Sequence, residues 1–534
     1  MAVKLDAATL DWVLKHIQRY GDTDIFPVPF EFQVIAKYWN SLPTGTRQKV
    51  VFSTWLASQE LTSWTMRTPR KCLSPKHQYG FRASTQLDPI DVIFFTGLIY
   101  EIGNDLELSR VPISKDIVYS YRFAPSADGK MFDSNIGYES FNKKTLEVAQ
   151  SLSGKWIVSA DIADFYPRIY SHPLENALSE ATHKNEHVRA IKQMLSKINH
   201  SVSYGIPVGP SASRLLAEIA ISDVDASLMS EGMKHLRFVD DYRIFCDTER
   251  EAYAALAFLA NTLFEHHGLT LQQHKTYIQK TDEYSEQHKV TDEDKEMISL
   301  SDKYQMLLKD LGMDDRYEPI DYSDLKEPQQ LQIDAMNLVE LLRELVTSEA
   351  QLDLTLTKFV LRRLTQLRDD NAIDLVLGNI TRLYPVFKDC LAYIKSMQDA
   401  PAVDTHEIGK RVIEMINNDI IGHLEYHRAW ILSLFTENSE WNNNEQFIPL
   451  YSKYSDSFTR RELTLALGRS NQAQWFKSRK RDFGMLDVWQ KRAFLAASSC
   501  LPGDEAEHWY RSLSPQLDEL EKAVVDWALS NPFG

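Results

Sequence analysis

The first half of the chain mixes segments that have strand patterns with segments that have helix patterns. Residues 156–166 form a short apolar run that ends in carboxylates, as a buried strand with a polar end would. Residues 235–246 carry apolar residues on both sides of an acidic pair, which favours a β-hairpin. Residues 252–269 read as a helix that Gly268 would end. This order of strand, hairpin and helix predicts an α+β fold for residues 1–285.

The second half, residues 331–534, has helical patterns throughout. One predicted helical face carries Leu356, Val360, Leu364 and Leu367. Arginines recur every 32 residues at Arg428, Arg460 and Arg492, and tryptophans every 34 at Trp441, Trp475 and Trp509. Repeats of about 30–45 residues built from helix pairs are typical of α-solenoids. We therefore expect an all-α helical-repeat domain of the HEAT-like kind, with an irregular helical bundle as the alternative.

Between these halves, residues 286–330 are acidic and poor in periodic apolar residues, which predicts a connector. The chain has 534 residues and a net charge of −16, so contact with nucleic acid must use a local basic patch. The four cysteines lie far apart and form no CxxC zinc pattern. No apolar run reaches the roughly 20 residues of a membrane span, and the charged N-terminus is unlike a signal peptide. We expect a soluble, cytoplasmic protein without a membrane partner.

Three carboxylates give the strongest chemical signal. Asp161 stands in S-A-D-I-A-D-F-Y-P-R, and Asp240 and Asp241 stand in R-F-V-D-D-Y. An Asp-Asp pair alone is usually a solvated turn, but this pair lies between apolar residues, where uncompensated carboxylates are unfavourable. A carboxylate that closes a strand can meet an acidic pair at a hairpin turn on one edge of a sheet. Phosphoryl transfer by two Mg²⁺ ions needs such oxygen ligands, so the sequence indicates a two-metal site.

Four segments together resemble the motifs of reverse transcriptases. F-V-D-D resembles motif C, whose common form is Y-x-D-D, and D-I-A-D-F-Y resembles motif A. Residues 205–214, G-I-P-V-G-P-S-A-S-R, are similar to motif B, and residues 268–276, G-L-T-L-Q-Q-H-K-T, to motif D. The four occur in the order and spacing of the family, and the resemblance covers about residues 60–280, the fingers and palm.

The resemblance implies roles for the acidic residues. Asp161, Asp240 and Asp241 would hold the catalytic metals, and the carbonyl oxygen of Ile162 would be a further ligand. Mg²⁺ is the expected ion, with Mn²⁺ as the alternative.

The resemblance also implies nucleotide-binding residues. Tyr166 stands where the family has a steric gate that excludes a 2′-hydroxyl and selects dNTPs; a core aromatic is the alternative. Gly209 would form the motif B turn, where the missing Cβ allows close approach to base or template. Lys275 would lie near the triphosphate and donate a proton to pyrophosphate. Lys76 and Arg82 are candidates for the basic residues of the fingers that clamp the triphosphate, with a solvated basic loop as the alternative.

The helical second half resembles that of the bacterial abortive-infection and defence-associated reverse transcriptases, the AbiK-like group. The forms G-I-P-x-G…S-R in motif B and R-F-V-D-D-Y-R-I-F around motif C fit the same group. This resemblance implies a homo-oligomeric DNA polymerase that uses dNTPs in anti-phage defence. Some members make DNA without a template and attach it to a tyrosine of the protein, whereas others copy a noncoding RNA. The sequence leaves both modes open.

Two further hypotheses remain. The chain could be an inactive reverse-transcriptase fold that serves as an RNA-binding scaffold, although its intact three carboxylates argue against this. The helical domain could also act as the module that senses phage, with the palm as its effector.

Overall fold

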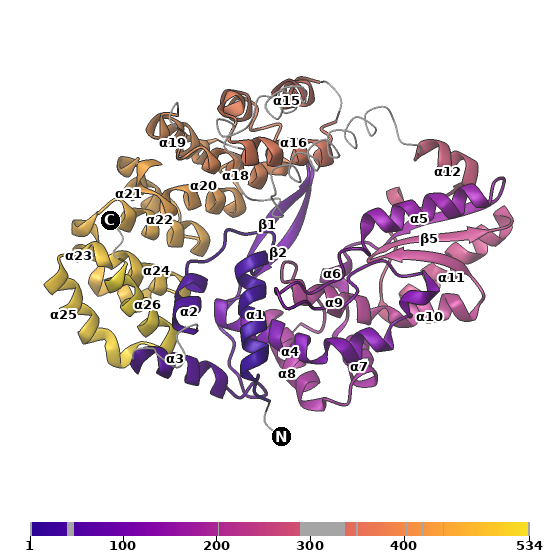
Figure 1. Cartoon of the computed structure of the whole chain (residues 1–534), viewed down its shortest axis with the longest axis horizontal. Helices are drawn as coiled ribbons and strands as arrows, with labels where there is room; N and C mark the ends of the chain where they lie inside the picture. Colours follow the sequence, from indigo (N-terminus) through magenta and orange to yellow (C-terminus); the bar gives the residue numbers. More distant parts are fainter. Residues whose placement is uncertain are drawn as a thin grey trace. The chain divides into compact units, whose positions relative to one another are not determined.

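The structure is a computed structural model, and it describes most of the chain. The described residues are 3–39, 47–200, 202–288, 337–348, 351–400, 403–418, 420–441 and 443–531. The expected connector, residues 286–330, lies outside them from residue 289 onward. The chain divides into two compact units (Figure 1). The first comprises Met1–Asp24, Val28–Lys71 and Ser84–Lys289, and the second comprises Ile25–Pro27, Cys72–Ala83 and Val290–Gly534.

The first unit contains a four-stranded antiparallel sheet. Its strands, in spatial order, are β4 (Lys234–Phe238), β5 (Asp241–Cys246), β3 (Trp156–Asp161) and β6 (Tyr277–Lys280). The sheet lies between α5 (Tyr138–Ser151) and α11 (Glu249–His267) (Figure 1). Ile157 and Phe245 are paired across β3 and β5 and pack in one cluster with Phe141 of α5. Since neighbouring residues in a strand point to opposite faces, the next pair, Val158 and Ile244, is buried on the α11 face.

The sequence patterns of this half agree with the observed elements. The predicted hairpin is β4 and β5, and the predicted helix is α11, which ends at Gly268 with a left-handed backbone (φ +62°). The central helix is α4 (Pro89–Ser109), which begins after the N-cap Asp88 and is buried around most of its circumference. The other elements of this unit are α1 (Ala7–Tyr20), α2 (Glu31–Trp39), α3 (Arg47–Ser58), η1 (Ile113–Lys115), α6 (Phe165–Arg168), α7 (Ser171–Ala181), α8 (Asn185–Ile198), α9 (Ser211–Ala220), α10 (Ser222–Ser230), η2 (Gln273–Lys275) and α12 (Thr281–Gln287).

Residues 70–86 form a two-stranded sheet of β1 (Arg70–His77) and β2 (Gly80–Gln86). Within this sheet, residues Cys72–Ala83 belong to the second compact unit and the remaining residues belong to the first.

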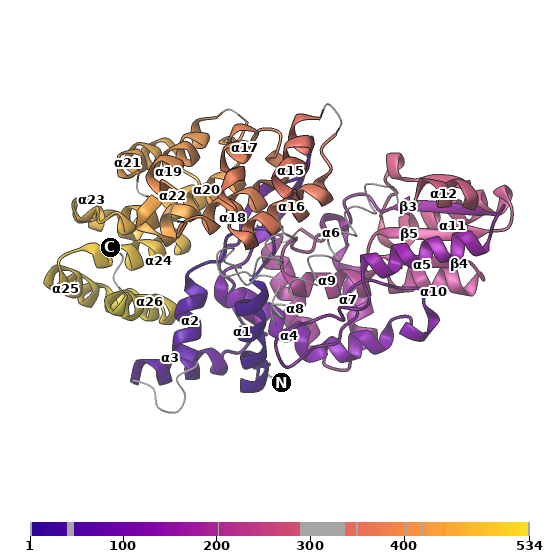
Figure 2. The ribbon, with the colours of Figure 1, turned by 45° about the horizontal axis from the view of Figure 1, so that its top comes forward.

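The C-terminal part of the second unit is helical, as the sequence predicts, and the described residues 337–531 contain no strand. Its longer helices are α15 (Leu338–Thr347), α16 (Leu354–Leu367), α18 (Phe387–Ser396), α19 (Thr405–Glu414), α20 (Glu425–Glu437), α21 (Asn444–Lys453), α22 (Ser457–Arg469), α24 (Val488–Ala497), α25 (Gly503–Leu513) and α26 (Glu519–Ser530). The shorter ones are η4 (Asp370–Ala372), α17 (Ile373–Gly378), η5 (Tyr384–Val386), η6 (Met415–Asn417), η7 (Ser439–Trp441), α23 (Ala473–Arg479), η8 (Lys480–Met485), η9 (Ser498–Cys500) and η10 (Ser514–Gln516). Helices α16, α18, α20, α22, α24 and α26 follow one another, each packed on the next (Figure 2). A solenoid stays a prediction.

A regular spacing is visible in the caps of the last three helices of this row. Asp456, Asp487 and Asp518 lie 31 residues apart, and each is the N-cap whose carboxylate accepts the backbone N–H three residues later. Arg428, from the predicted arginine series, lies in α20 and donates to Asp456 (2.9 Å). This arginine therefore joins one helix to the cap of the next.

A short segment from the start of the chain belongs to the helical unit. The indole Nε1 of Trp430 donates to the backbone oxygen of Ile25 (3.0 Å). Phe26 is buried and stacks on Phe458, with 5.2 Å between the ring centroids. Within the described residues, no helix is both long enough and apolar enough to cross a membrane.

A substitution at Gly468 would test how closely the helices of this row pack. A Cβ added at Gly468 in α22 would lie 2.5 Å from the Cβ of Ala497 in α24. We expect Gly468→Ala to reduce the free energy of unfolding by about 1–3 kcal/mol, because the added methyl group would overpack the core. The control is Gly378→Ala in α17, where no atom of the described chain lies within 4 Å of the added Cβ. Thermal unfolding should show a lower midpoint for Gly468→Ala alone, and equal midpoints would contradict close packing.

Candidate active site

The sheet brings two of the three predicted carboxylates together. Asp161 ends β3 and Asp241 begins β5, and the two residues are direct partners in the antiparallel register. Opposite residues in such a pair have Cα atoms about 4.5–5.5 Å apart. Asp240 precedes Asp241 in the turn, and its backbone oxygen accepts a hydrogen bond from the N–H of Ile162 (3.0 Å). The ends of β3 and of the hairpin are therefore joined through the backbone.

The hairpin turn has an unusual backbone at Val239, whose φ is +56°. A positive φ is unfavourable for a β-branched residue, so the turn needs support from its surroundings. The Val239 N–H donates to Oγ of Ser120 (2.9 Å). The Val239 carbonyl accepts from Nη1 of Arg237 (3.0 Å). These two bonds fix the residue that directly precedes the acidic pair.

Arg237 is the centre of a buried network of charges. Its Nη2 donates to Oδ2 of Asp225 (2.6 Å), and its Nη1 donates to Oε2 of Glu218 (3.0 Å). Glu218 also accepts from Arg110 (2.7 Å) and from the hydroxyl of Ser120 (2.5 Å). The charged side chains of this network are at most 1% exposed. Burial alone would raise the pKa of Asp225, but the charge of Arg237 lowers it to about 2.

Lys275 lies beside one of the predicted carboxylates, and its role toward the triphosphate stays a prediction. Its Nζ donates to Oδ2 of Asp161 (2.8 Å). Burial would lower the pKa of Lys275, but the hydrogen bond with Asp161 and the charges of Asp161, Asp241 and Asp240 together raise it. Lys275 is therefore held in its protonated form beside all three acidic residues.

The surroundings of Asp241 favour a cation. Burial raises the pKa of Asp241, and the charge of Asp161 adds to this increase although Arg243 opposes it. Nη1 of Arg243 lies 3.4 Å from Oδ1 of Asp241. In the part of the chain that the structure describes, no group of three or more His, Cys, Asp or Glu side chains is arranged to hold a metal ion. The oxygen donors suit Mg²⁺, which would compete with the contacts from Lys275 and Arg243.

Tyr166 connects the first acidic segment with residues 205–214. It lies in α6, and its backbone oxygen accepts from the N–H of Ile206 (2.9 Å). Burial raises the pKa of Tyr166 well above its ordinary value, and the charge of Asp240 acts in the same direction. The ring therefore lies within electrostatic reach of Asp240.

Position 209 requires a glycine, because of its backbone conformation and the atoms that surround it. Its φ is +142°, and an added Cβ would lie 2.9 Å from both Oγ1 of Thr23 and the backbone oxygen of Thr85. The Thr85 N–H donates to the carbonyl of Val208 (2.9 Å), which holds the turn against β2. The space that the resemblance assigns to a base or template is bounded here by Thr23 and Thr85. The nucleotide contact stays a prediction.

The two fingers candidates belong to the second compact unit. Lys76 in β1 and Arg82 in β2 are both exposed, and residues 72–83 are part of that unit. Arg82 lies close enough to Tyr426 of α20 to lower the pKa of that phenol, although burial raises it more. The triphosphate clamp stays a prediction for both residues.

Sequence reasoning did not identify the network beneath the turn. Arg214 is another residue that it did not assign: the guanidinium lies 5.2 Å from the ring centroid of Tyr121 and 3.1 Å from Asp24. The available signal was the position of Arg237 between the apolar residues Leu236 and Phe238 of the hairpin. Such a residue is rarely buried without a partner.

Comparison with known proteins identifies the domain that carries these residues. Residues 120–294 match the family described as reverse transcriptase (RNA-dependent DNA polymerase). The chain therefore contains a reverse transcriptase domain, which indicates a nucleotidyltransferase of the polymerase type. None of the curated proteins matches the chain.

Two solved telomerase structures show a distant likeness. The structure of telomerase from Candida albicans in complex with a fragment of telomeric RNA is 11% identical, with a TM-score of 0.32, and the match covers 74% of this chain and 67% of that chain. Apo telomerase from Candida tropicalis is 12% identical, with a TM-score of 0.32, and the match covers 77% of this chain and 73% of that chain. At these scores neither likeness adds to the family match.

The buried network predicts the effect of removing its central cation. Arg237→Met leaves Asp225 and Glu218 buried with less compensation, which should reduce the free energy of unfolding by about 3–5 kcal/mol. Amide hydrogen exchange in residues 234–246 should become faster, because the hairpin loses its anchor. The control, Arg250→Met, changes an exposed arginine of α11. If both variants unfold and exchange alike, the network does not support the turn.

Proposed function

We propose that this chain is a DNA polymerase of the reverse-transcriptase type, in which Asp161, Asp240 and Asp241 hold two Mg²⁺ ions, or Mn²⁺ in their place. The observation that carries the proposal is the register of β3 and β5. It sets Asp161 opposite Asp241 at the acidic turn, inside the domain that matches reverse transcriptases. The carbonyl of Ile162, whose N–H binds the backbone of Asp240, is the proposed further ligand.

The chemistry would be nucleotidyl transfer to a hydroxyl. Bound metals would lower the pKa of the attacking hydroxyl and neutralise the triphosphate. Lys275, whose Nζ donates to Oδ2 of Asp161, would lie near the triphosphate and would donate a proton to the leaving pyrophosphate. Lys76 and Arg82 would contact the triphosphate, and Gly209 would shape the turn next to the base.

We further propose a role in anti-phage defence, as a cytoplasmic homo-oligomer. The support is the combination of a reverse transcriptase domain with a helical second half, which resembles the AbiK-like group. Two modes of synthesis fit this proposal. The DNA is either started on a tyrosine of the protein without a template, and stays covalently attached, or copied from a noncoding RNA.

One observation favours a second candidate, an inactive fold that binds RNA as a scaffold. Asp161 and Asp241 already contact Lys275 and Arg243 in the described structure. If these ion pairs persist in solution, the carboxylates would not bind metal.

The first test is incorporation of labelled dNTPs with Mg²⁺, with and without RNA. Asp240→Ala should reduce incorporation on the order of 10³-fold or more, because a metal ligand is lost. The matched control is Asp247→Ala, a carboxylate that is 71% exposed and pairs with Lys155. Equal incorporation by Asp240→Ala and the native chain, or none by the native chain under any condition, would refute the polymerase and favour the scaffold.

The product of the same reaction distinguishes the two modes of synthesis. Phenol extraction before and after protease treatment shows whether the DNA is attached to protein. Sequencing shows whether it copies an RNA.

Tyr166 predicts selection of the sugar. If its ring excludes a 2′-hydroxyl, Tyr166→Ala should reduce the preference in kcat/KM for dNTPs over rNTPs by about 10- to 100-fold. Tyr166→Phe keeps the ring and should leave the preference unchanged. An unchanged preference in Tyr166→Ala would assign the side chain to the core instead.

A further inference from the structure

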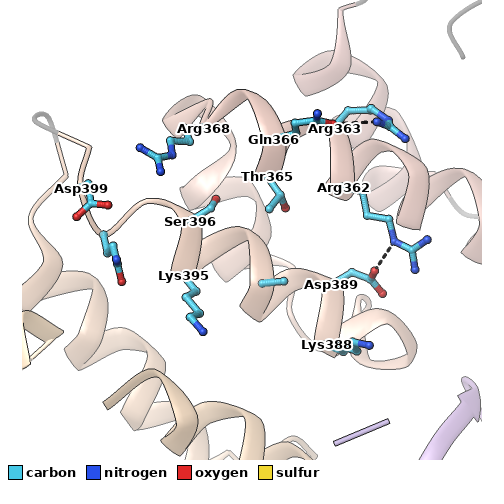
Figure 3. A pocket seen from close by; sticks show the side chains of 12 residues that line it. Arg362, Arg363, Thr365, Gln366, Arg368, Lys388, Asp389, Lys395, Ser396 and Asp399 are labelled. Carbon is cyan, nitrogen blue, oxygen red and sulfur yellow. Dashed lines mark hydrogen bonds and ion pairs between the residues drawn. The ribbon is translucent and has the colours of Figure 1, made fainter. Parts of the chain in front are cut away.

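The helical unit contains a cavity with five cations among its twelve lining residues, although the chain as a whole has a net charge of −16. The cavity has a volume of about 610 Å³ and lies between α16 with the loop after it and α18 with the loop after it (Figure 3). Its cationic lining residues are Arg362, Arg363, Arg368, Lys388 and Lys395. Its lining carboxylates are Asp389 and Asp399. Positive charge therefore exceeds negative charge locally.

The cations lie at both ends of the cavity. Figure 3 shows Arg368 and Lys395 toward one end, Arg362 and Lys388 toward the other, and Thr365 between them. Arg362 lies in α16 and Arg368 is the C-cap of the same helix. The six positions between them correspond to a rise of about 9 Å along the helix axis. The charges are thus arranged for a ligand that carries more than one anionic group.

Carboxylates pair with two of these cations, Arg362 and Lys395. Nε of Arg362 donates to Oδ1 of Asp389 (2.9 Å), and Lys395 forms an ion pair with Glu437 of α20. Nε of Arg368 is buried and has no hydrogen-bond partner among the described residues. Cations in the last turn of a helix also offset the helix dipole, which gives Arg368 and Lys395 a structural explanation. That explanation does not apply to Arg362, which precedes the last turn of α16, or to Lys388, which lies in the first turn of α18. Nζ of Lys388 lies 5.8 Å from the ring centroid of Trp430.

The side chains around the cavity indicate the chemical class of the ligand. Guanidinium and ammonium groups bind phosphate oxygens. The hydroxyls of Thr365 and Ser396 also line the cavity, but they already donate to the backbone oxygens of Leu361 and Tyr393. The described lining residues include no aromatic ring on which a base could stack. Recognition would therefore depend on phosphate and not on base identity.

We propose that this cavity binds phosphate groups, carried either by a nucleic-acid strand or by a free nucleotide. This site is separate from the proposed active site. Its ligand could be bound whether or not the reverse transcriptase domain polymerises.

The test measures how tightly the full chain binds two probes in the absence of divalent metal. The probes are a fluorescent oligothymidylate of about 20 nucleotides and dTTP. The test variant is Arg368→Asn with Lys395→Gln. Asn tolerates the left-handed backbone of position 368 (φ +51°), and Gln retains a donor for Glu437. The control is Lys410→Gln with Arg481→Gln, which removes the same charge from exposed positions of the same unit outside the cavity.

For the strand, we expect the test variant to bind about tenfold more weakly than the control. The slope of log K against log salt should also decrease in magnitude by about 1.4, since two phosphate contacts are lost at about 0.7 each. If dTTP binding alone is weakened, the ligand is a free nucleotide. If the test variant binds both probes as the control does, the proposal is wrong.

A second measurement does not depend on the variants. An oligothymidylate with photoreactive groups on its phosphates, and dTTP with such a group on its γ-phosphate, should each be tested on the native chain. Attachment of either probe to peptides from residues 362–368 or 388–399 supports the site. Attachment of both probes only elsewhere would overturn it.

Discussion

The position of the acidic pair depends on one buried interaction, the contact of Arg237 with Asp225 and Glu218. Its guanidinium binds two carboxylates and also the carbonyl of Val239, so the strained turn and the charge network are a single arrangement. Removing three charges from water is costly unless each is paired and hydrogen-bonded. The network satisfies this condition with groups from α9, α10 and β4. The position of Asp240 and Asp241 therefore depends on two helices that contain neither of these residues.

The sequence predicted those parts of the site that local patterns encode. The hairpin and the helix that ends at Gly268 follow from alternation and a stop signal. Asp161 was expected to meet the acidic pair at one edge of a sheet, but its direct pairing with Asp241 is seen only in the structure. Glu218 was not predictable as a partner of Arg237, because a buried ion pair between separate elements leaves no periodic trace. The contact of Gly209 with Thr23 was missed for the same reason: the two residues meet only in the folded chain.

Average composition concealed the electrostatics of the helical unit. A net charge of −16 indicates only that any anion site must be a local basic patch, and the structure shows five cations around one cavity beside α16 and α18. The arginine series at 428, 460 and 492 drew attention to spacing, but the cap carboxylates 31 residues apart correspond better to the starts of successive helices. A helix begins where an acceptor meets its first N–H groups, so capping residues mark a structural repeat more directly than core residues do.

The segment Ile25–Pro27 has a consequence for how the chain folds during its synthesis. Ile25 bonds to Trp430, which the ribosome adds 405 residues later. At about 5–20 residues per second, the apolar Phe26 waits roughly 20–80 s for its native surroundings. From the synthesis of Lys280, which ends β6, until that of Trp430, this segment lacks its native contact although every strand of the sheet has been made. Translation rate and chaperone access should therefore influence the yield of the native protein.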